Sequence, residues 1–294
     1  MFGRVITAMV TPFFDDLSVN YEAAAELAQF LVSTGSDGLV VCGSTGEGSA
    51  LSDDEKLSLF SAVANAVTVP VLAGTSSANT QNSVALTQHA STTGVAGILA
   101  TTPAYARPSQ SGIASHLGAM ADATKLPVVL YDIPSRTGRK IAAETTISIV
   151  RAHANVRGIK DASTDLTSAA HLKAVLGDSF DLYSGDDPLT LPFISIGGVG
   201  IVSVAAHWAG PEFAAMVESA LCGKWDLARD LNERLQHSYA FEASEQYPNP
   251  LPAKAALRAL GHRVGQCRLP LGASDDELDQ RAAVVVAELS AQRV

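Results

Sequence analysis

The sequence predicts an α/β fold and, within that class, a (β/α)8 TIM barrel followed by a C-terminal helical appendage. Three observations support this prediction. Short β-branched runs alternate with longer segments of helical spacing along most of the chain. The runs are nearly all apolar, as parallel strands are when helices cover both faces of their sheet. Eight pairs of run and helix follow one another within about 220 residues, which is enough to close a barrel.

The first apolar run, Val5–Thr11, also bears on the main structural alternative. A doubly wound open sheet would show the same alternation, but a Gly-x-Gly-x-x-Gly turn often follows its first strand. No such turn follows Thr11, so we favour the closed barrel. The remaining expected strands, in order, are Gly38–Cys42, Val69–Ala73, Gly97–Thr101, Pro127–Tyr131, Val156–Lys160, Asp181–Ser184 and Gly200–Val204.

Helical segments are expected between these strands. Tyr21–Ser33 places its apolar side chains on one face, and Ser52–Val67 opens with the capping-box sequence Ser-Asp-Asp-Glu. The same spacing predicts further helices at Asn79–Thr92, Gln110–Ala123, Ala143–Ala152, Thr164–Val175, Leu189–Ile196 and Pro211–Leu221.

The last part of the chain lacks the β/α alternation. Three helical stretches, Trp225–Tyr239, Pro252–Leu260 and Asp275–Ala291, are separated by proline and glycine turns. We therefore expect a barrel domain that carries the catalytic residues over residues 1–223 and a C-terminal helical region over residues 224–294.

Composition argues against several classes of protein. With 47% hydrophobic and 17% charged residues, the chain can bury a large core, unlike a disordered protein. Its net charge of −10 disfavours nucleic acid as a partner. No apolar run reaches the roughly 18 residues of a membrane span, and the N-terminus does not read as a signal peptide. The three cysteines and seven histidines form no recognisable metal or disulfide pattern, so we expect a cytoplasmic protein without metal or cofactor.

One strand end raises a question. The sequence Val-Arg-Gly-Ile-Lys-Asp-Ala-Ser, residues 156–163, places Lys160 at the end of an apolar run, although lysine is seldom fully buried unless it is paired. Active sites of (β/α)8 barrels lie at the C-terminal ends of the strands. The other polar candidates at these ends are Ser44, Thr45, Glu47, Tyr105, Arg107, Tyr131, Asp132, Arg136 and Asp186–Asp187.

Each candidate also has an ordinary structural interpretation. The sequence Gly-Ser-Thr-Gly-Glu-Gly suits a turn, and Tyr131 can be a core aromatic residue with a satisfied hydroxyl. Arg136 can be half of a surface salt bridge. Lys160 can pair with Asp161, and Asp186–Asp187 can cap the next helix.

Taken together, the candidates support one kind of chemistry. A lysine amine in a desolvated pocket is a nucleophile that forms a Schiff base with a carbonyl group. A tyrosine on the adjacent strand can move the protons that making and breaking C–O bonds requires. Ser44 and Thr45 can bind a carboxylate, and Arg136 can hold a second one in bidentate geometry. A keto acid that meets a second carboxylated substrate would use all of these groups.

The chain resembles the family of pyruvate-dependent class I aldolases and lyases that includes dihydrodipicolinate synthase and N-acetylneuraminate lyase. Three motifs carry the resemblance in the right order: Gly-x-Thr-Gly-Glu at 43–47, Tyr-x-x-Pro-x-Arg-Thr-Gly at 131–138 and Gly-Ile-Lys-Asp at 158–161. The similarity extends to Asn-Pro-Leu-Pro-Ala-Lys at 249–254. It implies a Schiff-base lyase that needs no cofactor and a homotetramer made of two tight dimers.

The resemblance also implies roles for four residues in the chemistry. Lys160 would form the imine with pyruvate, and Tyr131 would shuttle protons. Thr45 would relay protons between Tyr131 and Tyr105, and Tyr105 would reach into the site of the neighbouring subunit.

A further set of residues would bind the substrates. The backbone amides of Ser44 and Thr45 would hold the carboxylate of pyruvate, and Arg136 would receive the carboxylate of the second substrate. Gly185 and Ile201 would line the pocket. Arg136 resembles the synthase branch of the family. The implied reaction is therefore the condensation of pyruvate with L-aspartate 4-semialdehyde to 4-hydroxy-tetrahydrodipicolinate, in lysine and diaminopimelate biosynthesis.

Two other functions remain open. One is a related pyruvate aldolase or lyase that acts on a sugar acid, such as N-acetylneuraminate or a 2-keto-3-deoxy acid, or on a 4-hydroxy-2-oxo acid. The other is a barrel that binds a keto acid without turnover, as a sensor or scaffold. The intact set of Lys160, Tyr131, Thr45 and Tyr105 argues against the second.

The chain departs from the family pattern where inhibited members bind lysine. Ala104 replaces a tyrosine of the effector cleft, and Ala78 and Asn82 stand at the positions of an asparagine and a glutamate that grip the effector. An amino acid cation without its carboxylate partner should bind poorly. We therefore expect that lysine does not inhibit this protein appreciably.

Overall fold

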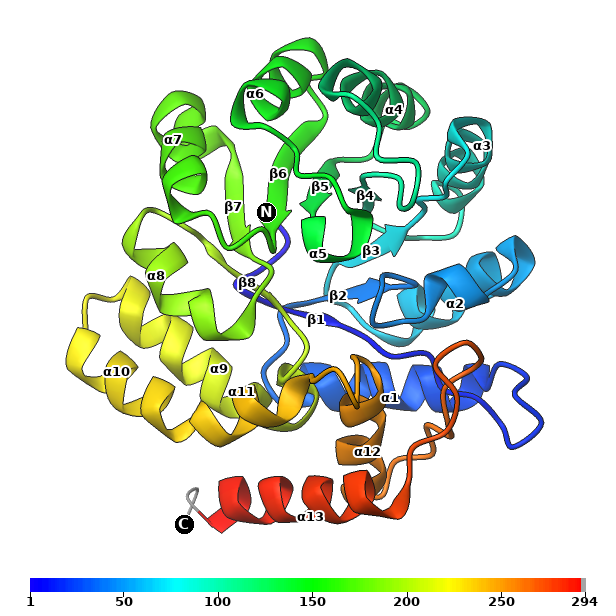
Figure 1. The fold of residues 1–294 in the computed structure, drawn as a ribbon, viewed down its shortest axis with the longest axis vertical. Coiled ribbons are helices and arrows are strands. Elements are labelled where there is room, and N and C mark those ends of the chain that lie inside the picture. The colour runs from blue at the N-terminus through cyan, green and yellow to red at the C-terminus, as the bar shows by residue number, and fades with distance from the viewer. Residues whose placement is uncertain (292–294) are drawn as a thin grey trace.

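The computed structural model describes residues 1–291 and contains the predicted barrel. Eight parallel strands close in sequence order, and the last pairs with the first (Figure 1). Every predicted strand is present, and the largest difference at an end is the stop of the first strand at Ala8 instead of Thr11. The strands are β1 (Val5–Ala8), β2 (Gly38–Val41), β3 (Val71–Gly74), β4 (Gly97–Thr101), β5 (Val128–Asp132), β6 (Val156–Asp161), β7 (Asp181–Ser184) and β8 (Gly200–Ser203).

Side chains alternate along each strand between two hydrophobic layers. Because the side-chain period of a strand is two, every second residue faces the barrel interior and the others face the helices. The outer layer joins strands to helices and includes residues such as Val5, Leu39 and Ile159. The inner cluster contains Phe2, Ile6, Ala8, Val40, Leu72, Leu99, Val129, Tyr131, Ile133, Tyr183 and Val202.

The N-terminal residues close one end of the barrel. Phe2 belongs to the inner cluster, and a Cβ atom on Gly97 would lie only 2.6 Å from its ring. The hydroxyl of Tyr183 donates a hydrogen bond to the Gly3 carbonyl oxygen at 3.1 Å. Access to the interior is therefore expected at the opposite end, where the C-terminal ends of the strands meet.

A ring of helices surrounds the strands (Figure 1). The predicted capping box is confirmed, since Ser52 Oγ accepts from the Glu55 N–H at 3.2 Å and Glu55 accepts from the Ser52 N–H at 2.8 Å. The helices of the barrel are α1 (Tyr21–Ser33), α2 (Asp53–Ala66), α3 (Thr80–Ala90), α4 (Gln110–Asp122), α5 (Pro134–Thr137), α6 (Ala143–Ala152), α7 (Leu166–Leu176), α8 (Thr190–Ser195) and α9 (Ala206–Leu221), with single 3₁₀ turns η1 (Gly48–Ala50), η2 (Gly177–Ser179) and η3 (Asp187–Leu189).

Two of these helices differ from the prediction. The short α5 was not expected, because a single turn leaves no periodic pattern to detect. Helix α9 begins at Ala206, whereas the sequence suggested a start at Pro211. Proline usually ends or bends a helix because it lacks an N–H and its ring crowds the preceding turn. Here the backbone bends at Ala209 (φ −117°, ψ 24°) and the helix continues through the proline.

Up to residue 291, the C-terminal region contains four helices where three were predicted. These are α10 (Trp225–Arg234), α11 (Gln236–Glu242), α12 (Leu251–Ala259) and α13 (Asp276–Ala291). The first predicted stretch is divided at Leu235, so it forms both α10 and α11. Helices α10 and α12 pack on α9, and α13 lies across α11 and α12 (Figure 1). The domain boundary at residue 223 stays a prediction.

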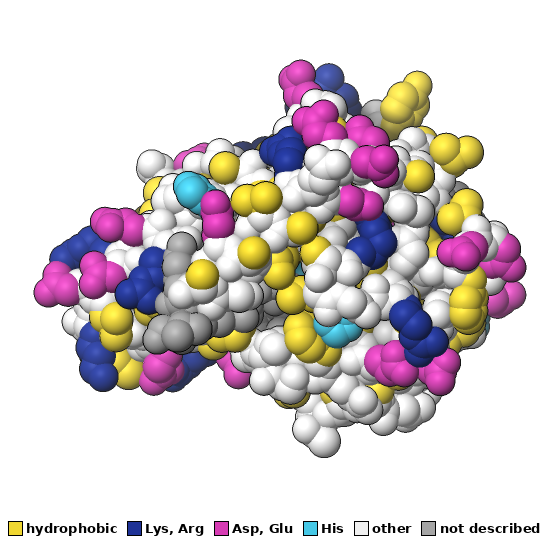
Figure 2. Space-filling model, turned by 90° about the horizontal axis from the view of Figure 1, so that it is seen from below, with side chains coloured by type: hydrophobic (Ala, Val, Ile, Leu, Met, Phe, Trp, Pro, Cys, Tyr) yellow, Lys and Arg dark blue, Asp and Glu magenta, His cyan; other side chains and the backbone are white. Residues whose placement is uncertain are grey.

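The surface mixes charges of both signs. Figure 2 shows one face of the molecule, on which acidic and basic side chains lie close together near its margins with hydrophobic ones scattered between them. On this face no extended basic area is present that could follow a phosphate backbone. Across residues 1–291, every helix falls short of the length and apolar character that crossing a membrane requires.

Candidate active site

Lys160 and Tyr131 lie side by side on the inner wall of the barrel. They are partners in the register of β5 and β6, and Lys160 Nζ lies 4.4 Å from the centroid of the Tyr131 ring. Each residue is only 4% exposed. An amine packed against an aromatic face in a dry site is poorly solvated. The structure thus brings together the predicted nucleophile and the predicted proton shuttle.

The alternative in which Lys160 pairs with Asp161 is wrong. Asp161 follows Lys160 on the strand and therefore points to the outer layer, where its Oδ1 accepts from the Ser163 N–H at 2.8 Å. Within residues 1–291, Lys160 forms no ion pair at close range, and its amine contacts the Tyr131 ring. Its burial therefore lacks the carboxylate partner that a structural lysine requires.

Two buried carboxyl groups lie behind this pair, on the outer side of the same strands. Asp132 and Asp161 are register partners on β5 and β6. Burial raises the pKa of Asp132 to about 7, although the carboxyl accepts from the Ile141 N–H at 3.1 Å. Burial also raises the pKa of Asp161. Because both face the helices, these groups bear on stability and do not contact the barrel interior.

The loop after β2 carries Ser44 and Thr45 in a tightly folded backbone. Thr45 is buried and Ser44 is half-buried. A Cβ atom on Gly46 would lie 2.9 Å from the Met9 carbonyl oxygen, and one on Gly48 would lie 2.1 Å from that of Cys42. The glycines are therefore required because the loop folds back on neighbouring backbone, which places the Thr45 hydroxyl in a fixed position at the barrel mouth.

Thr45 and Arg136 meet at a residue that the sequence reasoning missed, Asn249. The Asn249 side-chain Nδ2 donates to Thr45 Oγ1 at 3.0 Å. The backbone carbonyl oxygen of the same residue accepts from Arg136 Nη2 at 3.0 Å. Asn249 precedes α12 and lies outside the predicted barrel, so the C-terminal region contributes directly to the arrangement of the site.

A second missed contact lies beside the first. Glu47 Oε1 lies 2.7 Å from Lys254 Nζ, and both side chains are 1% exposed. The other oxygen of Glu47 accepts from the Arg268 N–H at 2.8 Å. Burial lowers the pKa of Lys254, and the Glu47 carboxylate opposes this effect. Glu47 therefore fastens the C-terminal segment to the β2 loop.

Tyr105 stands apart from the buried group. It is 98% exposed, with a φ of 68°, on the loop between β4 and α4. Arg107 anchors this loop by donating from Nε to the Gly138 carbonyl oxygen at 3.0 Å. The structure of the single chain does not bury Tyr105 beside Lys160 and Tyr131.

The two residues expected to line the pocket differ in their surroundings. The Gly185 N–H donates to the Asp161 carbonyl oxygen at 2.7 Å, and a Cβ atom there would lie 2.9 Å from that of Ala162. Position 185 therefore needs glycine. The Ile201 side chain belongs to the outer cluster, whereas Val202 belongs to the inner cluster with Tyr131. The pocket-lining role of Ile201 stays a prediction, and Val202 is the residue of this strand whose side chain packs with Tyr131.

A buried acidic group lies at the end of β7. The sequence suggested that Asp186–Asp187 could cap the next helix. The side chain of Asp187 does not do so, since η3 has no side-chain cap. Its carboxylate instead accepts from Ser203 Oγ and from the Val204 N–H at 2.9 Å. Glu242 of α11 is hydrogen-bonded to Asp187, and burial together with that negative charge raises its pKa well above the usual range. The Lys160 ammonium acts in the opposite direction.

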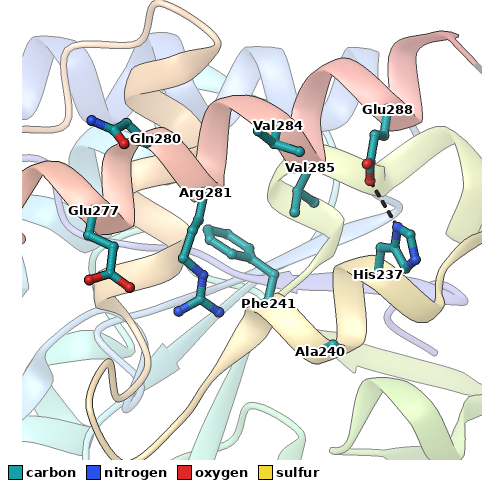
Figure 3. A pocket seen from close by; sticks show the side chains of 9 residues that line it. All are labelled: His237, Ala240, Phe241, Glu277, Gln280, Arg281, Val284, Val285 and Glu288. Carbon is teal, nitrogen blue, oxygen red and sulfur yellow. Dashed lines mark hydrogen bonds and ion pairs between the residues drawn. The ribbon is translucent and has the colours of Figure 1, made fainter.

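One hollow of the molecule lies away from the barrel mouth. A groove of about 510 Å³ lies between α11 and α13, and the ion pair of His237 with Glu288, at 2.9 Å, lies across it (Figure 3). Phe241 and Val285 supply apolar walls. This groove contains no buried nucleophile. Residues 1–291 also contain no group of three or more His, Cys, Asp or Glu side chains that could hold a metal ion.

The geometry at the barrel mouth is suited to carbonyl chemistry. It combines an unpaired buried amine, an adjacent phenol, a fixed hydroxyl and a guanidinium group. An amine of this kind can attack a carbonyl, and the phenol can supply or remove the proton that dehydration of the adduct requires.

Comparison with known proteins places this arrangement in a family. The model of the dihydrodipicolinate synthetase family matches residues 1–289. A Desulforamulus reducens protein named 4-hydroxy-tetrahydrodipicolinate synthase is 45% identical over 272 residues, which cover 92% of this chain and 91% of that protein.

Solved structures agree with this match. The lysine-bound dihydrodipicolinate synthase of Cyanidioschyzon merolae superposes with a TM-score of 0.95 at 39% identity, and the match covers 98% of each chain. The chloride-inhibited dihydrodipicolinate synthase of Acinetobacter baumannii, solved in complex with pyruvate, gives a TM-score of 0.93 at 28% identity over 99% of each chain.

Proposed function

Because the chain belongs to the dihydrodipicolinate synthetase family, we propose that it condenses pyruvate with L-aspartate 4-semialdehyde to give 4-hydroxy-tetrahydrodipicolinate. It acts as a Schiff-base lyase in lysine and diaminopimelate biosynthesis. The structural observation that supports this function is the buried amine of Lys160, which lies against the Tyr131 ring without an ion pair.

In the first stage, Lys160 attacks the keto carbon of pyruvate. The carbinolamine loses water to give an imine, and Tyr131 donates the proton that the departing hydroxide needs. The position of Lys160 on the inner face of β6, in register with Tyr131, supports these roles. The folded loop at Ser44 and Thr45 supports their role as donors to the pyruvate carboxylate.

In the second stage, the enamine formed from the imine attacks the aldehyde of the second substrate. Arg136 is the group for the carboxylate of that substrate, and its bond to the Asn249 carbonyl oxygen holds the guanidinium in place. A second guanidinium edge stays available for bidentate binding. This assignment favours the semialdehyde, because the aldehyde half of a sugar acid is a neutral polyol without a carboxylate for the guanidinium to bind.

The site is completed by a second subunit in this proposal. The near-complete exposure of Tyr105 supports a role across a subunit interface, since an exposed ring on an ordered loop would be buried by a partner. By the same family resemblance we propose a cytoplasmic homotetramer made of two tight dimers. Sedimentation of the purified protein measures this directly, and a monomer at assay concentration with full activity would contradict the role of Tyr105.

Borohydride trapping tests the central step. The protein is incubated with saturating pyruvate and reduced, and the labelled peptide is identified by mass spectrometry. We expect one adduct, on Lys160. Lys254 is an internal control in the same sample, because it is equally buried but is ion-paired. An unmodified Lys160 would refute the proposed function.

A substrate comparison then separates the synthase from its relatives. We expect turnover of pyruvate with L-aspartate 4-semialdehyde and little cleavage of N-acetylneuraminate, 2-keto-3-deoxy sugar acids or 4-hydroxy-2-oxo acids. Substitution Arg136→Leu should raise the KM for the semialdehyde and leave the trapping of pyruvate intact. Equal turnover of a sugar acid would favour the aldolase alternative.

A further inference from the structure

We propose that Asn249 is a positioning residue, whose carboxamide sets the direction of the Thr45 hydroxyl so that the Thr45 proton is available to Tyr131. This inference rests on the proposed function, because it concerns the proton path of imine formation. It assigns part of the catalytic arrangement to the C-terminal region, more than 200 residues along the chain from the loop that it controls.

The argument begins with the hydrogen bond itself. A threonine hydroxyl has one O–H donor and two acceptor lone pairs. Asn249 Nδ2 donates to Thr45 Oγ1 at 3.0 Å, which occupies one lone pair. The Thr45 O–H cannot point at that nitrogen, because an amide NH₂ group accepts no hydrogen bond. The proton must therefore point away from the C-terminal segment, and the second lone pair stays free to receive another proton.

The asparagine is itself held at both ends. The backbone carbonyl oxygen of Asn249 accepts from Arg136 Nη2 at 3.0 Å. The same segment continues into α12, where Lys254 pairs with Glu47. Glu47 lies in the same loop as Thr45. Two contacts thus fasten the segment from residue 249 to residue 254 to the β2 loop, and the Asn249 amide is presented to Thr45 by a rigid support.

The other side-chain atom of Asn249 separates this role from a structural one. Asn249 Oδ1 is buried and has no hydrogen-bond partner within residues 1–291. A buried acceptor without a partner costs stability, and a purely structural asparagine would be expected to use both ends of its amide. The bond to Thr45 is therefore the one side-chain hydrogen bond that accounts for an asparagine here.

The direction of the hydroxyl matters for the proposed reaction. While Tyr131 gives its proton to the departing hydroxide, the Thr45 O–H donates to the developing phenolate, and Thr45 takes up on its free lone pair the proton that Tyr105 gives in the proposed relay. No bond other than O–H bonds changes at Thr45 or Tyr131, so the relay is balanced. A hydroxyl turned toward the C-terminal segment would interrupt it.

The test uses two substitutions that differ in polarity. Asn249→Ala removes the amide, and Asn249→Asp keeps its shape but presents only acceptors, which would attract the Thr45 proton away from Tyr131. The measured quantity is the rate of imine formation with pyruvate alone, by quenching with borohydride over time. Because the second substrate is absent, a change in how Arg136 would bind that substrate does not affect the measured rate.

We expect both variants to form the imine more slowly and the aspartate variant to be the slower of the two. The rate of imine formation should fall about 10-fold for the alanine variant and about 100-fold for the aspartate variant. The larger value is the lower end of the range that a proton-transfer group contributes. A role in packing alone predicts the reverse order, because aspartate matches asparagine in shape.

A double-mutant cycle with Thr45→Val completes the test. If Asn249 acts through the Thr45 hydroxyl, the Asn249 substitutions should have no further effect once that hydroxyl is gone. Gln246→Glu is the matched control, an amide-to-carboxylate change at an exposed position three residues before Asn249, and it should leave the rate unchanged.

Two results would overturn the proposal: an aspartate variant that is faster than the alanine variant, or losses that add to that of Thr45→Val. The final extent of trapping on Lys160 tests the proposed function separately. A slow rate that reaches full trapping concerns the relay, whereas no trapping in the unmodified protein would reject the imine itself.

Discussion

Two buried lysines in this protein have opposite surroundings. Lys160, on the inner face of β6, is 4% exposed and contacts the Tyr131 ring without an ion pair. Lys254, on α12, is 1% exposed and pairs with Glu47 at 2.7 Å, donates to the Gln266 carbonyl oxygen at 2.9 Å and lies 4.2 Å from the centroid of the Phe13 ring.

The difference between them teaches that burial alone does not make a lysine reactive. A buried ammonium with a carboxylate partner remains charged and joins parts of the fold. A buried lysine that lacks an ion pair and packs against an aromatic ring is not committed to a carboxylate of the fold, so its amine can meet a carbonyl group instead. Both residues would satisfy a search for buried lysines, and only their partners distinguish them.

The largest effect is expected from Lys160→Met. Imine formation requires the amine, so activity should fall by roughly 10⁴-fold or more, on the scale seen when a covalent nucleophile is removed. Stability should be unchanged or higher, because an unpaired polar group is replaced by an apolar one of similar shape. Enzyme assays and chemical denaturation measure the two quantities. A marked loss of stability would mean that Lys160 has a structural partner after all.

The reverse result is expected for Lys254→Met. This change leaves the Glu47 carboxylate buried without its cation, which should lower the free energy of unfolding by about 3–5 kcal/mol. Urea denaturation provides the measurement, and Lys224→Met, an exposed lysine of the same region, is the control. Protein that stays folded should still form the imine at Lys160. If stability is unaffected, the two lysines do not differ in the way that we describe.

A smaller effect is expected behind Lys160, at Asp132. Folding raises the pKa of this carboxyl from its ordinary 3.8 to about 7, so the native state keeps a proton that the unfolded chain has released. Between these pH values stability should therefore fall as pH rises, by at most about 4 kcal/mol, and should level off above pH 7.

Asp132→Asn should remove this part of the pH dependence and leave imine formation intact, because the side chain faces the helices. Denaturation of both proteins at pH 4, 6 and 8 would give the comparison. The variant should gain most over the natural chain at pH 8. Parallel curves for the two proteins would show that Asp132 does not titrate differently in the folded state.

The smallest effect is expected from added free lysine. Its ammonium group would need a carboxylate partner, as Lys254 has in Glu47. Ala78, Asn82 and Ala104 are exposed and supply no carboxylate. We therefore expect activity to change little when lysine is added at up to millimolar concentration. A lysine titration of the pyruvate and semialdehyde reaction measures this, and strong inhibition below 1 mM would contradict it (about 4 kcal/mol or more of binding free energy).

The fold could be predicted from the sequence almost completely because its signal is periodic. Most strands are short apolar runs with β-branched residues, and the capping box at Ser52 predicted the start of a helix that the structure contains. The errors fall where periodicity gives no guidance. Helix α9 passes through Pro211 because a local bend at Ala209 relieves the clash, and the short α5 has too few residues for a pattern.

The candidate site was accessible from the sequence only in part. Lys160 and Tyr131 could be placed together because the ends of adjacent parallel strands meet. Asn249 and Lys254 could not be linked to Thr45 and Glu47, since no local rule connects segments so far apart in the chain. The sequence also did not show which face of β8 each side chain occupies: Ile201 lies in the outer cluster and Val202 in the inner one, because neighbouring residues of a strand point to opposite faces.

The contact between Asn249 and Thr45 has a consequence for how the protein is made. The two residues are 204 positions apart, so the β2 loop leaves the ribosome long before the segment that fastens it. A nascent barrel with all eight strands would still have Glu47 without its cation and Thr45 without its amide neighbour. In the proposed relay, the proton path is therefore complete only after residue 249 has been made and has folded back onto the β2 loop.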